Sequence, residues 1–478
     1  MHVATVPWSR LDPGNDLARA YLAEPPLALP LFAHDYRDPR ALRPLLDARR
    51  ERPRLGAILE RYNREVGGSP ENALRLDEGF CVVSGQQAGL LLGPAYTAYK
   101  LFTVIRAARA LEAELKAPVV PVFWVETEDH DWEEVNRFFW GDRRYRLDVE
   151  VAPGTPVGRV EADPAPFLAE VREALREGEA WEVVEPERNV ARWHVRSLAR
   201  LVKGEGVVFL EPSLLREPMR PLAERVASAH GAIDASLLRD TGFDRALAPP
   251  AGAYLFDSGG PRRRLARGAK VPAQWSTDVV SRVLVQNAAL PVLAAVCGPA
   301  EIRYWAQLKG AHEALGIPMP AVLPRVSATL VEEGIARDAS KLGADLEEVV
   351  RGVAKPPEPD VPDPLAARLR RLVAEAKDLE AARLDLPPNT ARPFRKTVER
   401  LRDELSKLAG RIEDARAEAR GAGRRHFDRI LRELRPRGLL QERTHSLFPY
   451  LLRHGTALAR ELRESFDPFE SGHYLVRL

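Results

Sequence analysis

The clearest hydrophobic pattern in the chain is a pair of short apolar runs, each followed by a polar loop and then a helical pattern. The first lies in residues 80–100 (FCVVSGQQAGLLLGPAYTAYK) and the second in residues 119–136 (VVPVFWVETEDHDWEEVN). A buried parallel strand reads as a near-continuous apolar run, and its loop carries side chains to the rim of the sheet. The pattern therefore predicts two neighbouring strands whose loops form the walls of a ligand site.

Apolar runs of strand length continue to alternate with helical patterns up to residue 329. Further strands are predicted at residues 206–211 (GVVFLE), in PVLAAVCGP and in AVLPR, and helices at residues 95–115, 165–176, 189–201, 214–230 and 300–315. Residues 141–163 are predicted to form an antiparallel insertion, and residues 252–260 a hairpin arm. Strands that alternate with helices indicate an α/β fold with a mostly parallel, doubly wound sheet.

The pattern changes after residue 329. KPPEPDVPDP (residues 355–364) predicts an extended linker, because a helix does not cross a proline-rich stretch. Beyond it, apolar residues recur at steps of three and four on either side of Pro387-Pro388, which predicts an antiparallel helical coiled-coil arm. Its seam consists of Leu365, Leu369, Leu372, Ala376 and Leu379, then Phe394, Val398, Leu401, Leu405, Leu408, Ile412, Ala415 and Ala419. Such a seam is buried either within the hairpin or against a second chain, and dimerisation is the expectation.

These patterns divide the chain into five predicted parts. They are N-terminal helices with the first half of the α/β core (1–140), a connecting insertion (141–205), the second half of the core (206–329), the helical coiled-coil domain (330–435), and a C-terminal segment that returns to the core (436–478).

The balance of charged residues limits the classes of partner that this protein is expected to bind. The 71 Lys and Arg residues nearly balance 69 Asp and Glu residues, and no polybasic tract is present, which argues against a nucleic-acid or membrane partner. The sequence has no signal-peptide pattern and no apolar run of membrane-spanning length, so a soluble, cytoplasmic protein is expected. Its two cysteines, Cys81 and Cys297, lie in apolar runs, where a buried structural thiol is favoured over a reactive one.

The first loop is a candidate binding cradle. Gln86 and Gln87 donate and accept hydrogen bonds, while Gly85, Gly89 and Gly93 permit close approach of a ligand to the backbone. The helix that follows favours an anionic group at its N-terminus. The loop is neither a Walker A sequence nor GxGxxG, and a tight structural turn is the alternative.

The second loop carries clustered acids around His130. Glu128, Asp129 and Asp131 would stabilise an imidazolium, so His130 is a candidate general base. Alternatively, Asp131 only caps the next helix, and Glu133 and Glu134 are favourable first-turn charges. One histidine with carboxylates does not specify a metal, so no metal site is assigned, although Mg²⁺ remains an option.

Two helical stripes provide further candidates. One predicted stripe contains Glu301, Tyr304, Trp305 and Lys309, which suits stacking of a base or sugar; the other contains Ser276, Asp278, Arg282 and Gln286, in which Arg282 suits a carboxylate. Ordinary helix packing and a solvated helix face are the alternatives.

Long strings of this sequence resemble the bacillithiol biosynthesis cysteine-adding enzyme family. They are SGQQAGLLLGPAYTAYK, PVVPVFWVETEDHDWEEVN, STDVVSRVLVQ, GPAEIRYWAQLK and LLQER, in the family's order along nearly the whole chain. The resemblance implies a Rossmann-like core related to class I aminoacyl-tRNA synthetases and pantothenate synthetase, with a dimerising coiled-coil domain. It also implies a ligase that joins the carboxyl group of L-cysteine to the amine of glucosaminyl-malate to form bacillithiol.

The resemblance also assigns site residues and partners. It places binding roles on Gly85, Gln86, Gln87, Gly89, Gly93, Tyr96, Thr97 and Asp129, and the binding candidates further include Asn136, Ser276, Asp278, Arg282, Gln286, Gly298, Glu301, Tyr304, Trp305 and Lys309. The catalytic candidates are His130, Asp131, Glu128 and Lys100. ATP is the expected activator of the carboxylate, with no tightly bound cofactor. The family usually has Arg-Pro at Arg282-Val283 and glycine at Ala300, and the synthetases' HIGH and KMSKS sequences are absent here.

Two other functions fit the same residues. One is an adenylate-forming or nucleotidyl-transfer enzyme that uses a different amine acceptor. The other is a coiled-coil scaffold with a vestigial pocket, which the dense polar loops at 84–100 and 128–136 disfavour.

Overall fold

The protein forms two compact units. The computed structural model describes residues 2–47, 52–238, 240–243, 254–356, 364–382, 386–418 and 423–478. One unit comprises Met1–Leu330 with Leu439–Leu478, and the other comprises Val331–Gly438. The C-terminal segment therefore belongs to the first unit, although the helical unit separates it from the rest in sequence.

A five-stranded parallel sheet forms the centre of the first unit. Its strands are β11 (Ala321–Pro324), β10 (Val292–Cys297), β2 (Phe80–Gln87), β3 (Val119–Glu126) and β6 (Val208–Leu210), in that spatial order. All four pairings are parallel, as the sequence predicts. In chain order the arrangement is 3-2-1-4-5, so the direction of winding reverses between β2 and β10. This reversal is the switch point at which doubly wound sheets bind ligands.

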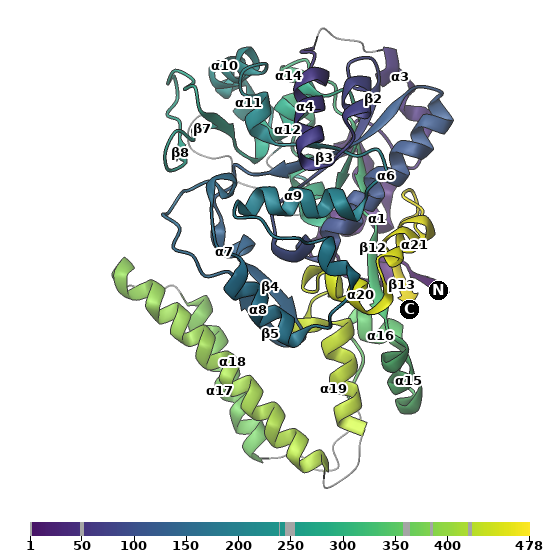
Figure 1. Cartoon of the computed structure of the whole chain (residues 1–478), viewed down its shortest axis with the longest axis vertical. Coiled ribbons are helices and arrows are strands. Elements are labelled where there is room, and N and C mark those ends of the chain that lie inside the picture. The colour runs from purple at the N-terminus through teal and green to yellow at the C-terminus, as the bar shows by residue number, and fades with distance from the viewer. Residues whose placement is uncertain are drawn as a thin grey trace. The chain divides into compact units, whose positions relative to one another are not determined.

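Helices cover the sheet and fix the direction of its strands. The long helix α6 (Ala95–Leu115) joins β2 to β3, is buried along most of its length, and packs against both strands (Figure 1). The helix α12 (Val279–Ala289) precedes β10 and begins with a capping box in which Asp278 accepts from the backbone of Ser281. A parallel crossover of this kind brings the carboxyl ends of β2, β3 and β10 to one edge of the sheet.

The remaining helices of this unit are short. They are α1 (Asp16–Ala23), α2 (Pro25–Ala28), α3 (Arg43–Asp47), α4 (Gly56–Val66), α5 (Pro70–Arg75), α7 (Trp132–Val135), α8 (Ala165–Ala174), α9 (Val190–Leu201), α10 (Arg220–Ser228), α11 (His230–Ser236), α13 (Pro299–Trp305), α14 (Lys309–Ala314), α20 (Phe448–His454) and α21 (Ala457–Ser465).

Both ends of the chain meet in a second sheet. Strand β1 (His2–Val6) pairs antiparallel with β13 (His473–Arg477), which lies beside β12 (Ser327–Val331). Figure 1 shows the two termini next to each other at this sheet. The C-terminal segment thus returns to the core, which brings residues 441–446 to the loops of the central sheet.

The antiparallel insertion is real, but its predicted limits are wrong. The hairpin consists of β4 (Arg137–Trp140) and β5 (Arg143–Arg146), so it starts before residue 141. Gly141, with φ +56°, forms the turn between the strands instead of opening the insertion. The predicted hairpin arm exists as β7 (Leu255–Asp257), which pairs with β8 (Arg263–Arg264) and β9 (Trp275–Thr277); residues 252 and 253 lie outside the described residues.

Two long predicted helices are interrupted. The stretch 214–230 contains a 3₁₀ turn, α10 (Arg220–Ser228) and the start of α11 (His230–Ser236), because Pro218 and Pro221 are tolerated only at a helix start. The stretch 300–315 forms α13 (Pro299–Trp305) and α14 (Lys309–Ala314). Between them the amides of Gln307 and Leu308 donate to carbonyls three residues back, so α14 starts with a different orientation from α13.

Apart from Val331, the last residue of β12, the described part of the second unit consists of helices and the loops between them. It contains α15 (Glu333–Leu342), α16 (Leu346–Arg351), α17 (Pro364–Ala381), α18 (Pro388–Glu418) and α19 (Gly423–Leu434). Helices α17 and α18 lie along each other as an antiparallel hairpin, with Arg402 bonded to Glu380 near one end and Arg370 to Glu413 near the other. This hairpin confirms the coiled-coil arm. Residues 357–363 of the predicted linker and Ala419 of the seam lie outside the described residues.

Only part of the predicted seam is buried within the hairpin. Leu369 and Ala376 of α17 and Val398 of α18 are buried, whereas a second row of leucines is 40–54% exposed. That row consists of Leu365, Leu372 and Leu379 on α17 and Leu401 and Leu408 on α18, at seven-residue spacing within each helix.

Candidate functional site

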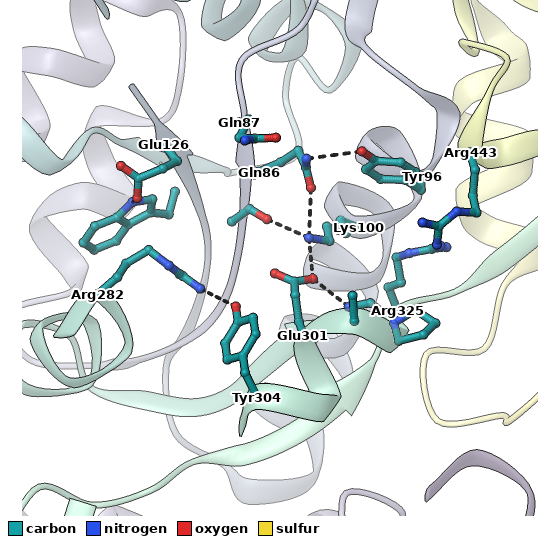
Figure 2. A pocket seen from close by; sticks show the side chains of 15 residues that line it. Gln86, Gln87, Tyr96, Lys100, Glu126, Arg282, Glu301, Tyr304, Arg325 and Arg443 are labelled. Atoms are coloured by element: carbon teal, nitrogen blue, oxygen red, sulfur yellow. Dashed lines mark hydrogen bonds and ion pairs between the residues drawn. The ribbon is translucent and has the colours of Figure 1, made fainter. Parts of the chain in front are cut away.

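A cavity of about 350 Å³ opens at the switch point of the central sheet. The carboxyl ends of β2 and β3, the start of α13 and the loop after β11 form its walls (Figure 2). Its lining residues are Gly85, Gln86, Gln87, Tyr96, Lys100, Trp124, Glu126, Arg282, Gly298, Pro299, Ala300, Glu301, Tyr304, Arg325 and Arg443. We refer to it as the switch-point cavity.

Lys100 lies at the centre of this cavity wall. Its ammonium donates to the carbonyl of Gly85 (2.8 Å) and the amide oxygen of Gln86 (3.0 Å), and it forms an ion pair with Glu301 (2.5 Å). Burial lowers the pKa of Lys100, and the Glu301 carboxylate opposes that shift. Because all three donors have partners, Lys100 joins α6, β2 and α13, and it is less available to a ligand than a free lysine.

Two arginines of the cavity have no carboxylate partner within 4.0 Å among the described residues: Arg282 and Arg443. Arg282 donates instead to the Tyr304 hydroxyl (2.7 Å) and to Gln286 (3.2 Å), which orient its guanidinium. Unpaired guanidinium groups in a partly dry cavity bind carboxylates or phosphates well.

Arg325, in contrast, is fixed by a buried carboxylate. It donates to Glu442 (2.6 Å), which also accepts from Ser327 Oγ (2.8 Å) and the backbone amide of Ala328 (3.0 Å). Burial acts to raise the pKa of Glu442, but Arg325, His473 and the Ala328 amide outweigh it, so the pKa lies below its ordinary value. The C-terminal segment thereby supplies one cavity residue, Arg443, and holds another in place.

The cavity lining as a whole is positively charged. It contains four cationic side chains, Lys100, Arg282, Arg325 and Arg443, and two carboxylates, Glu126 and Glu301. Glu301 neutralises Lys100, and Glu442 behind the wall neutralises Arg325. Arg282 and Arg443 are therefore the cationic groups of this lining that no described carboxylate neutralises, while Glu126 adds one negative group.

A second cavity of about 290 Å³ adjoins the first along the glycine loop. Gln86, Gln87, Tyr96 and Arg443 line both cavities, and the second also contains Gly89, Gly93, Thr97, Glu134, Arg137, Phe138 and Phe139 among its lining. The Thr97 residue is buried, and it lines this cavity. We refer to this space as the glycine-loop cavity.

The glycine loop has an unusual backbone conformation. Leu91 (φ 48°), Leu92 (φ 73°) and Gly93 (φ 69°) follow one another in the left-handed region, which residues with a Cβ rarely adopt. The C-terminal segment holds this conformation, since Ser446 Oγ donates to the Leu91 carbonyl (2.6 Å) and Ala95 donates its amide to the His445 carbonyl (2.7 Å). The loop therefore has a fixed conformation, which contacts from a distant segment stabilise, and it is not a simple reverse turn.

The acidic loop between β3 and α7 lies beside these cavities, but its catalytic candidates do not line them. Glu128 is buried in an ion pair with Arg216, and Asp129 accepts from Gln87 and from the His130 amide. The His130 side chain is 44% exposed, with Nδ1 3.6 Å from Asp129 Oδ1. Asp131 precedes α7 without forming a side-chain cap.

Several predicted binding residues also lie outside both cavities. Trp305 is buried and stacks on His312, and Lys309 donates to the Pro30 carbonyl from the separate helix α14. Ser276 shares a hydrogen bond with Ser258, and Asp278 caps α12. The two predicted helical stripes are thus wrong as continuous faces, because the break after Trp305 and the end of β9 change the direction of the chain. Asn136 ends α7 and Gln286 supports Arg282.

Sequence reasoning missed six lining residues: Pro299 and Ala300 at the start of α13, and the larger side chains of Trp124, Glu126, Arg325 and Arg443. Each of the four larger side chains lies in a sequence feature that could have indicated it. Trp124 and Glu126 end an apolar strand, Arg325 follows the predicted strand AVLP, and Arg443 lies in the string LLQER. None of these signals indicates that strands far apart in sequence meet at one edge.

Both cysteines are buried free thiols. Burial raises the pKa of Cys81 and of Cys297, which keeps each thiol protonated at neutral pH. This agrees with the structural interpretation of both residues.

In the described part of the chain, no three or more His, Cys, Asp or Glu side chains are grouped as metal ligands. None of the described helices is both long enough and apolar enough to cross a lipid bilayer.

Two family models together match nearly the whole chain. "Bacillithiol biosynthesis BshC, N-terminal Rossmann-like domain" matches residues 1–237 and 264–326, and "Bacillithiol biosynthesis BshC, C-terminal coiled-coil domain" matches residues 328–478. Among curated proteins, "Putative cysteine ligase BshC" of Symbiobacterium thermophilum is 30% identical, with 99% of each chain covered. The protein of that name from Anoxybacillus flavithermus is 28% identical over 87% of this chain and 89% of its own.

One solved structure, described as a putative arginyl-tRNA synthetase from Campylobacter jejuni, has a TM-score of 0.26. It is 10% identical and covers 86% of this chain and 97% of its own. A similarity of this extent carries no argument about function, so the expected relation to the synthetases stays a prediction.

Proposed function

Because this chain belongs to the bacillithiol biosynthesis BshC family, we propose that it is a cysteine ligase, which forms bacillithiol by joining L-cysteine to glucosaminyl-malate. The observation that carries the proposal is that both domain models of the family match this chain, the Rossmann-like domain first and the coiled-coil domain after it. A ligase activity follows from the family; the acceptor and the place of the reaction as the last step are the finer parts of the proposal.

The charge of the switch-point cavity supports an acceptor of this chemistry. Malate contributes carboxylates, and Arg282 and Arg443 are guanidinium groups that no described carboxylate neutralises within 4.0 Å. We assign Arg282 to a malate carboxylate, because Tyr304 and Gln286 already fix its orientation.

Amide formation also requires activation of the cysteine carboxylate, since an amine does not displace hydroxide from a carboxylate at neutral pH. ATP is the proposed activator, and it would supply a phosphate or adenylate leaving group. The residues that fit its phosphates line the glycine-loop cavity: the loop backbone, the start of α6, the Thr97 hydroxyl, and Arg137 and Arg443.

His130 remains the residue proposed from the sequence to take the proton from the attacking amine. Its exposed position outside both cavities gives this role no geometric support in the present conformation.

The exposed leucine row of the helical hairpin supports a homodimer. Leu365, Leu372 and Leu379 form an apolar line on α17 and are 40–50% exposed. Light scattering tests this: the native protein is expected at twice the chain mass of 53.2 kDa, and Leu372→Glu with Leu379→Glu is expected to shift it toward that mass. A monomeric native protein would contradict the dimer without affecting the proposed reaction.

The reaction itself is tested with purified protein, ATP, L-cysteine and glucosaminyl-malate. Mass analysis is expected to detect bacillithiol together with ADP or AMP, whose identity distinguishes an acyl phosphate from an adenylate. Omission of ATP should abolish the product. If a different amine is consumed in preference to glucosaminyl-malate, the ligase stands and the acceptor is wrong.

A further inference from the structure

The carboxylates at the active edge of the sheet differ in their partners. Glu301 pairs with Lys100, Glu128 with Arg216 and Asp278 with Arg264. Glu126 has no such partner: among the described residues, no Lys, Arg or His nitrogen lies within 4.0 Å of it. Its one hydrogen bond comes from the indole of Trp124, which donates to Oε2 at 3.1 Å.

Glu126 is also the carboxylate best placed to meet a ligand. It is the last residue of β3, lies opposite Gln87 in the register of the sheet, and lines the switch-point cavity. Figure 2 shows Glu126 and Arg282 at one side of the cavity, with Lys100 and Glu301 near its middle. The second oxygen, Oε1, has no hydrogen-bond donor among the described residues, although the side chain is only partly exposed.

An ionised carboxylate in this position lacks a direct ion-pair partner among the described residues. Burial raises the pKa of Glu126, and the more distant Arg282 and Arg262 oppose part of that shift, while Asp129 adds to it. A cationic group that enters the cavity would supply the missing partner, and a primary ammonium fits because it is small and has three donors.

We infer that Glu126 binds the primary amine of a substrate in the switch-point cavity. The inference rests on the proposed function, in which both organic substrates carry such an amine: the α-amino group of cysteine and the amine of glucosaminyl-malate. Glu126 and Arg282 then form one recognition unit, in which the carboxylate binds an ammonium and the guanidinium binds a carboxylate.

The two sources of the amine predict different roles. If the α-amino group of cysteine binds, Glu126 orients cysteine and takes no part in proton transfer. If the acceptor ammonium binds, it first loses one proton to Glu126, which passes it to water, and the free amine is then the nucleophile. In that step the nitrogen lone pair forms the C–N bond to the carbonyl carbon of ATP-activated cysteine, the acyl–oxygen bond breaks, and the leaving group departs with that electron pair. The released N–H proton passes to Glu126 Oε1.

The first test is Glu126→Gln, which keeps the shape and the Trp124 hydrogen bond but removes the charge. Loss of a charged hydrogen bond is expected to raise the KM for one substrate about 10- to 100-fold. A higher KM for cysteine alone assigns the cysteine amine. A higher KM for glucosaminyl-malate, with a lower kcat and a changed acidic limb of the pH–rate profile, assigns the acceptor amine. Glu133→Gln is the matched control, because Glu133 pairs with the surface residue Arg146 and lines neither cavity.

A second test uses the wild-type protein and does not depend on the folding of a variant. 3-Mercaptopropionate, which lacks the amine of cysteine, and the acceptor with hydroxyl in place of its amine are measured as competitive inhibitors. The wild type is expected to bind one of them at least tenfold more weakly than the matching substrate, and Glu126→Gln is expected to lose that discrimination.

Unchanged KM values and an unchanged pH–rate profile in Glu126→Gln would overturn the inference. The same holds if the wild type and Glu126→Gln distinguish the amine-free analogues from the substrates equally well. Failure of the proposed function gives a different result, because the wild-type protein would then form no product from the three substrates.

Discussion

The two loops that leave β2 and β3 carry their polar residues differently. In the glycine loop, Gln86, Gln87 and Tyr96 line both cavities. In the acidic loop, Glu128 and Asp129 are bound to side chains of other elements, and His130 points to the surface. A high density of charged residues therefore marks one loop as a structural junction, while the loop with few charges provides the cavity walls.

The physical reason lies in what each loop connects. The acidic loop joins the sheet to the β4–β5 hairpin and to the segment near Arg216, and its carboxylates compensate arginines that would otherwise be buried unpaired. The glycine loop has to come close to a ligand, which requires small residues and a fixed backbone more than it requires charge.

The largest effect on stability and activity is expected from a substitution of Lys100, which supports the glycine loop. Lys100→Met removes the ammonium that joins Gly85, Gln86 and Glu301, and it leaves the Glu301 carboxylate with the Gly298 amide as a donor but without its cation. We expect a loss of about 3 kcal/mol of unfolding free energy, at the low end for a buried pair because Glu301 is partly exposed, together with loss of ligase activity. Urea unfolding and product formation measure both, with the exposed Lys203→Met as control. Full activity at normal stability would show that this wall is not needed.

Glu128→Gln is the matching change in the acidic loop. Its ion pair with Arg216 is largely buried, but Arg216 also donates to the Trp275 carbonyl and to Gln274. We expect a loss of about 2 kcal/mol of unfolding free energy with kcat/KM of the folded protein unchanged within threefold. A double-mutant cycle with Arg216→Gln isolates the pair. A large fall in kcat at normal stability would instead give Glu128 a catalytic role.

His130→Ala should have the smallest effect. The side chain is 44% exposed and lies outside both cavities, so the unfolding free energy should change by less than about 0.5 kcal/mol. We expect kcat/KM to stay within about tenfold of the native value, because general-base catalysis contributes about 10² or more where it operates. A fall of about 10² or more in kcat/KM, measured by product formation with saturating ATP, would assign a catalytic residue to the acidic loop. This result would contradict the contrast between the two loops.

Local patterns in the sequence were sufficient for much of this picture. The apolar runs at Phe80 and Val119 predicted two adjacent parallel strands, and the seven-residue repeats predicted the helical hairpin. The glycine loop was identified as a cavity wall from residue types alone. These predictions succeeded because strand burial, helix periodicity and glycine requirements each act within a few residues of the chain.

Other features required contacts between distant segments. The helical stripe through Glu301 and Lys309 failed because three intervening residues turn the chain, a detail that apolar spacing does not encode. Likewise, the charge of His130 and its neighbours suggested catalysis, since nothing local shows that Arg216 and Gln87 already occupy those carboxylates.

The sequence by itself determined the parallel α/β core, the coiled-coil arm and the loop around Gly85, because the periods of hydrophobicity dictate which faces must be buried. Only the tertiary structure decided which charges face the cavity. Arg443 and the Glu442 that fixes Arg325 come from a segment more than a hundred residues beyond β11, and Glu126 lines the cavity without the ion-pair partner that the nearby Glu128 has. Whether a charge is neutralised or available depends on distances between elements, which no local pattern contains.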